Sequence, residues 1–86
     1  MTQPQDARTL AALEEQSRQL AHILARLESA RVALVPTADR DWHGAARNAF
    51  DLAVSGLVST VDAGIAALRS ALFHTDRAIA ELVYRA

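Results

Sequence analysis

The stretch LAALEEQSRQLAHILARLESARVAL, residues 10–34, decides the fold. Apolar residues recur along it at alternating intervals of three and four, the spacing that aligns side chains on one face of an α-helix. Six of the eight positions in this register are leucine. The pattern predicts a long helix with one buried seam, made of Leu10, Leu13, Ser17, Leu20, Leu24, Leu27, Arg31 and Leu34.

A second segment repeats this spacing in the C-terminal half of the chain. Strand-like alternation is absent, and β-branched residues do not cluster as they do in strands. A neighbouring apolar stripe, Ile65, Leu72, Ile79 and Val83, widens the face toward the C-terminus. The second seam consists of Phe50, Val54, Leu57, Val61, Gly64, Leu68, Ala71, Thr75, Ala78 and Leu82.

Two long helices joined by a short turn predict an all-α protein, an antiparallel two-helix hairpin. We expect one domain over residues 1–86, with helices at about 6–35 and 42–84 and a turn at about 36–41. Pro36 disfavours helix at the residue before it. Asp39 or Asp41 is a candidate cap for the second helix, because a carboxylate accepts hydrogen bonds from free N–H groups there.

A turn centred near residues 38–41 predicts the register of the hairpin. Leu27 then faces Phe50 and Val54, Ser17 lies opposite Gly64, and Arg31 lies near Asp51. On the solvated face, Glu14 and Arg18 are one helical turn apart, in the favourable order.

The longer second helix would overhang the first by about 20 Å at its C-terminus. This leaves apolar side chains without a partner in the chain: Phe73, Ile79, Leu82, Val83 and Tyr84. Such exposure predicts a dimer, a four-helix bundle. The expected hairpin and dimer interface contains Leu13, Leu20, Leu24, Leu27, Phe50, Leu57, Val61, Leu68, Leu72, Phe73, Ile79 and Leu82.

Composition narrows the functional classes. The formal net charge is −1 and the basic residues are dispersed, which argues against nucleic-acid binding. All nine basic residues are arginine, and alanine is abundant, as in proteins from GC-rich genomes such as actinobacterial ones. The N-terminus lacks the pattern of a cleaved signal peptide. Asp62 and Arg69 interrupt the most apolar segment, so we expect no stable membrane insertion.

No constellation of residues indicates catalysis or metal binding. His22, His43 and His74 lack the spacing of a metal site, and the chain has no cysteine. No grouping of serine, acid and histidine suggests a nucleophilic centre. We therefore expect a non-enzymatic protein without cofactor or metal. An amphipathic protein that binds lipid is a weaker alternative, since the charge is nearly balanced.

The central stretch PTADRDWHGAARNAF, residues 36–50, holds the only tryptophan of the chain. Trp42-His43-Gly44, followed by small residues and Phe50, in the turn of a short helical hairpin, resembles the WXG family of small Esx-type proteins. A tryptophan there can bridge both helices and keep its N–H accessible to solvent or a partner. Gly44 leaves room for the ring. Trp42 and Gly44 are the expected recognition residues.

The resemblance implies a homodimer or a heterodimer with a paralogous WXG-like protein. It also implies a role as substrate or partner of a type VII secretion system, in contact with its ATPase. Such a protein is cytoplasmic before export and is secreted without a cleaved signal peptide. The family's Tyr-x-x-x-Asp/Glu element is missing, because Tyr84 is followed only by Arg85 and Ala86. The alternative is a cytosolic structural hairpin unrelated to secretion.

Overall fold

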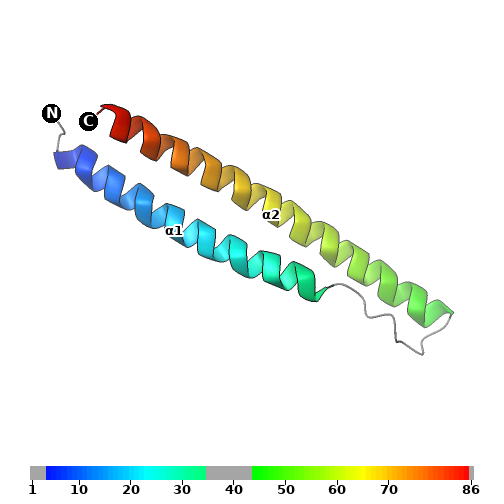
Figure 1. Ribbon diagram of the computed structural model, residues 1–86. Coiled ribbons are helices and arrows are strands. Elements are labelled where there is room, and N and C mark those ends of the chain that lie inside the picture. Colours follow the sequence, from blue (N-terminus) through cyan, green and yellow to red (C-terminus); the bar gives the residue numbers. More distant parts are fainter. Residues whose placement is uncertain (1–3, 35–43, 86) are drawn as a thin grey trace.

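The computed structural model describes residues 4–34 and 44–85, which form two helices and no strand (Figure 1). The helices are α1, Pro4–Ala33, and α2, Ala45–Arg85. They run antiparallel, so that the start of α1 lies beside the end of α2 (Figure 1). The predicted all-α hairpin is confirmed.

Helix α1 begins and ends two residues earlier than predicted. Pro4 occupies its first position, where the missing N–H removes no helical hydrogen bond. At the other end, the N–H of Leu34 donates to the carbonyl of Arg31 at 3.2 Å, a tightened last turn that satisfies one terminal carbonyl. The cation of Arg31 is favourable in that turn because helix C-termini carry partial negative charge.

Helix α2 begins at Ala45, and Gly44, directly before it, acts as its cap. Gly44 has a φ of 74°, a left-handed conformation that costs glycine little. Its carbonyl accepts the first helical hydrogen bond, from the N–H of Asn48 at 3.1 Å. The predicted alternatives for this cap, Asp39 and Asp41, lie outside the described residues. The connection between the helices is longer than the predicted turn.

The register differs from the predicted one, because the start of α2 extends past the end of α1. Ser17 was expected opposite Gly64, but its hydroxyl donates to Asp76, twelve residues further along α2, at 2.7 Å. Gly64 instead lies against Leu27: a Cβ built on it would stand 3.2 Å from Leu27 Cδ2. Pairs such as Gln16 with Thr75 and Leu27 with Gly64 are centred between residues 45 and 46, in the first turn of α2, and not near residues 38–41.

The predicted overhang is at the wrong end of α2. Its C-terminal turns lie beside the start of α1, and Ala78 and Leu82 line a shallow hollow together with Thr9 and Leu13. The turns that extend past α1 are the first ones, since Arg31 in the last turn of α1 already pairs with Asp62 (Figure 1). The residues of α2 from 45 to about 59 therefore lie beyond the end of α1.

The seam between the helices is thin. Among the described residues, only Ile65 and Thr75 are buried, with 7% and 5% of their surface exposed. Most of the predicted interface is half-buried, whereas Leu57 and Phe73 are exposed. The half-buried members are Leu13, Leu20, Leu24, Leu27, Phe50, Val61, Leu68, Leu72, Ile79 and Leu82.

Candidate interaction surface

Polar bonds between the helices gather on one side of the seam, which we call the charged edge. Three pairs span it: Ser17–Asp76 at 2.7 Å, Arg31–Asp62 at 2.8 Å and Glu28–Arg69 at 2.7 Å. The α2 members are seven residues apart, so they lie in one line along the helix. The predicted pairing of Arg31 with Asp51 is wrong, because Asp51 binds Arg47 one turn away in α2.

The opposite side of the seam, which we call the uncharged edge, carries no charged side chain over residues 9–30 of α1 and 50–78 of α2; Arg85, in the last turn of α2, lies one heptad further along the same line. Two residues along a helix rotate a side chain by about 200°, so Gly64 lies across the seam from Asp62. The line through Gly64 repeats every seven residues. Within the described residues, the uncharged edge consists of Thr9, Gln16, Ile23 and Ala30 of α1 and Phe50, Leu57, Gly64, Ala71 and Ala78 of α2.

Two large apolar side chains of the uncharged edge are half exposed. Ile23 of α1 exposes 50% of its surface and Leu57 of α2 exposes 49%. Ile23 borders a shallow hollow of about 270 Å³ that Arg26 and Leu27 complete. The polar group nearest the seam is satisfied, since Gln16 Nε2 donates to Thr75 Oγ1 at 2.8 Å. This edge therefore offers apolar contact without an unpaired polar group in its middle.

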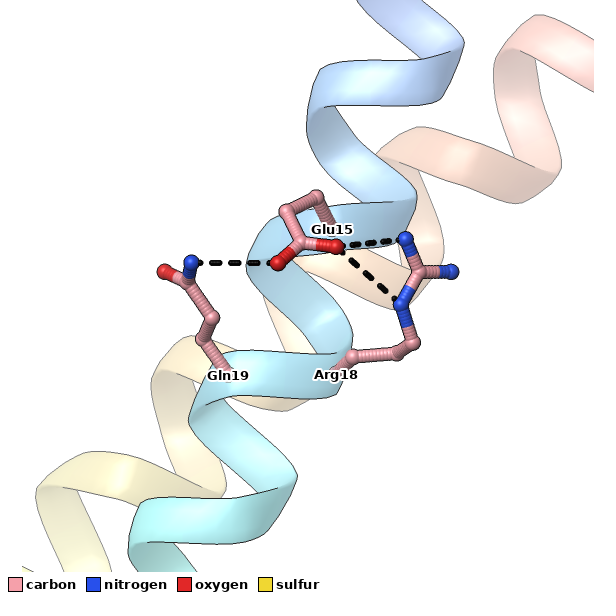
Figure 2. A network of polar contacts seen from close by, with 3 residues as sticks. All are labelled: Glu15, Arg18 and Gln19. Atoms are coloured by element: carbon pink, nitrogen blue, oxygen red, sulfur yellow. Dashed lines mark hydrogen bonds and ion pairs between the residues drawn. The ribbon is translucent and has the colours of Figure 1, made fainter.

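The outer surface of α1 is solvated and charged. Arg18 donates two hydrogen bonds to Glu15, at 2.6 and 3.2 Å, and Gln19 donates a third at 3.2 Å (Figure 2). The hydrogen bonds and positive charge of Arg18, with the bond from Gln19, hold the pKa of the Glu15 carboxyl below its usual range. The sequence predicted Glu14 as the partner of Arg18. This surface has no apolar stripe for a partner.

The chain exposes more surface than a compact protein of its mass. Its accessible area is 6537 Å², whereas a globular monomer of 9.3 kDa exposes about 5,000 Å². Its radius of gyration is 19.9 Å, compared with about 12 Å for a compact domain of this length. The hairpin is a rod, 68 Å in its longest dimension, with room for a partner along its length.

By length and composition, α2 is the one described helix that would suit a membrane span. Its most apolar 18-residue window has a mean hydropathy of 1.4. Helices in the cores of soluble proteins meet the same criterion, so this property by itself is weak evidence. Asp62 and Arg69 lie in the middle of α2 and both bind side chains of α1.

Of the predicted recognition residues, Trp42 and Gly44, the structure describes only Gly44. Gly44 is the cap of α2, and Trp42 and His43 lie outside the described residues. Sequence reasoning missed Ile23 and Gln16, which stand beside the predicted seam of α1 and not in it. Uncharged residues recur every seven positions in both helices, and this spacing could have indicated the uncharged edge. It identifies that edge only when the position of the charged edge is also known.

Within residues 4–34 and 44–85, no group of three or more His, Asp or Glu side chains is arranged to hold a metal ion. The ring of His74 meets the ring of Phe73 edge to face, with centroids 5.5 Å apart, and both side chains are exposed. No family model, curated protein or solved structure matches the chain.

Proposed function

We propose that this chain is a non-enzymatic interaction protein that works by docking another helical hairpin, completing a four-helix bundle. The observation that carries the proposal is the 6537 Å² of exposed surface, about 1,500 Å² more than a compact chain of this size. Half of a bundle has this property, because its second layer is supplied by the partner. The uncharged edge is where that layer would lie.

The partner is a second copy or a paralogous hairpin of the same kind. Both would offer a matching apolar stripe to Ile23 and Leu57. Helical bundles of this type pack through ordinary side-chain interdigitation and need no cofactor or metal.

In its finer form the proposal assigns the chain to type VII secretion, as an Esx/WXG-like substrate or dimerisation partner. The hairpin architecture and the Trp42-His43-Gly44 sequence support it. The chain would be cytoplasmic before export and secreted without a cleaved signal peptide, and the secretion ATPase would be a further partner. We propose no stable insertion of the chain into a membrane.

Export tests the secretion assignment. The chain is expressed in a bacterium with a working type VII system and in the same strain lacking the secretion ATPase. We expect the chain in the culture medium only when the ATPase is present. Trp42→Ala should retain its helicity, measured by circular dichroism, and lose export.

Two results would contradict this assignment. Equal amounts in the medium of both strains would show that export does not use the system. Normal export of Trp42→Ala would remove the recognition role of the indole. The alternative, a cytosolic structural or interaction hairpin unrelated to secretion, requires only the hairpin and its uncharged edge, and it predicts that the chain stays inside the cell in both strains.

A further inference from the structure

We propose that a second copy of this chain docks along the uncharged edge, with α2 antiparallel to α2 of the other copy and crossing it at Gly64. This inference rests on the proposed function, since it specifies which hairpin completes the bundle and in which register. The contact between the two copies would be made by the α2 residues of the uncharged edge, from Phe50 to Ala78.

The sizes of the side chains along this line favour a symmetric antiparallel pair. Large residues, Phe50 and Leu57, precede Gly64, and small ones, Ala71 and Ala78, follow it at the same intervals. Two-fold symmetry at Gly64 places Leu57 of each copy opposite Ala71 of the other, and Phe50 opposite Ala78. Each large side chain meets a small one, the complementarity that close helix packing needs.

The second copy also lies along the overhang of α2 in this arrangement. Residues 45 to about 59 extend beyond the last turn of α1, and Leu57 is half exposed there. Antiparallel pairing at Gly64 brings residues 70–83 of the second copy alongside residues 45–58 of the first. The part of α2 that α1 does not reach would thus be covered by the other copy.

The second copy also completes the hollow beside Ile23. Gln16 lies level with Thr75 and Leu27 lies level with Gly64, so Ile23 lies level with about residue 68. Leu57 of the other copy arrives opposite Ala71, about three residues or about 4.5 Å along α2 from that level. Its side chain would lie against the Ile23 end of the hollow formed by Ile23, Arg26 and Leu27.

The surface available is sufficient for a stable dimer. Two separate copies expose twice 6537 Å², whereas a globular protein of twice the mass exposes about 8,200 Å². The difference, about 4,800 Å², is an upper limit for the area buried and falls in the range of permanent interfaces, about 2,000–5,000 Å². The charged edge, with its cross-helix ion pairs satisfied, stays in water.

Disulfide trapping tests the register, because the chain has no native cysteine. Leu57→Cys and Ala71→Cys are purified separately, mixed in equal amounts and oxidised. We expect a cross-linked dimer from the mixture, since only facing Cα atoms about 5–7 Å apart form the bond. The control mixture joins Leu52→Cys to Phe73→Cys, two exposed positions of α2 away from the uncharged edge, and should stay monomeric on a non-reducing gel.

A matched pair of substitutions tests the energetics by sedimentation. Leu57→Glu should raise the dimer dissociation constant by about tenfold or more, because a charge would enter a desolvated contact. Leu52→Glu, on the same overhang but 74% exposed, should leave the constant unchanged. Circular dichroism confirms that both variants keep their helices.

The outcomes separate this inference from the proposed function. A dimer that cross-links through 57 and 57, or through 52 and 73, would overturn the register at Gly64 and leave the bundle proposal standing. A chain that is monomeric alone at micromolar concentration would overturn pairing with a second copy. The export experiment would then test the proposed function separately.

Discussion

At the scale of single residues, spacing predicts which charges can meet but not which pair forms. Arg18 can reach acids three or four positions before it, and the structure pairs it with Glu15 and not with Glu14 (Figure 2). Arg31 has the same freedom across the seam, and its partner is Asp62, not the predicted Asp51. Choosing between such neighbours requires the side-chain conformations for Arg18 and the alignment of the two helices for Arg31. Residue types alone give neither.

The carboxyl of Glu15 should titrate below the usual glutamate range, because Arg18 and Gln19 bind its charged form. Arg18→Ala should move its pKa up toward the ordinary value, and Gln19→Ala should move it by less. Side-chain NMR titration measures both. Because the folded pKa is the lower one, this contribution to stability is present above the unfolded pKa and is lost as the pH falls through the folded pKa. An unchanged midpoint in Arg18→Ala would contradict the assignment of Arg18 as the main cause.

At the scale of the helices, periodicity predicted both helices and their inner faces, because seams such as Leu20 to Leu27 leave only one face to bury. It did not predict how the helices are aligned. A three-four pattern packs nearly as well after one helix slides by whole heptads, so the pattern does not select one alignment. For this reason the predictions of the overhang and of the residue opposite Gly64 were wrong. The uncharged edge can be identified only from the positions of the ion pairs on the charged edge.

The two mid-helix glycines of α2 should respond differently to alanine. A Cβ on Gly56 meets nothing within 4 Å, so Gly56→Ala should raise the free energy of unfolding by about 1 kcal/mol through helix propensity. At Gly64 the new methyl would press on Leu27 Cδ2 at 3.2 Å, so Gly64→Ala should give a smaller gain. Urea denaturation followed by circular dichroism compares them. Equal gains would show that Leu27 does not pack closely on Gly64.

At the scale of the whole molecule, the hairpin has the secondary structure of a folded protein without a comparable core. Only Ile65 and Thr75 are buried among the described residues, and the exposed area is that of an open rod. The overhang of α2 lies at its N-terminal end and not at the predicted C-terminal end. The proposal of a partner therefore rests on the total exposed surface and on the uncharged edge.

The most direct test of this account is the molar mass of the purified chain in solution. Sedimentation equilibrium at micromolar concentration should give twice 9.3 kDa for the native chain, and the monomer mass should appear on dilution or in Leu57→Glu. A mass of 9.3 kDa with full helicity and a cooperative unfolding transition would contradict the account, because the hairpin would then be stable without any second copy.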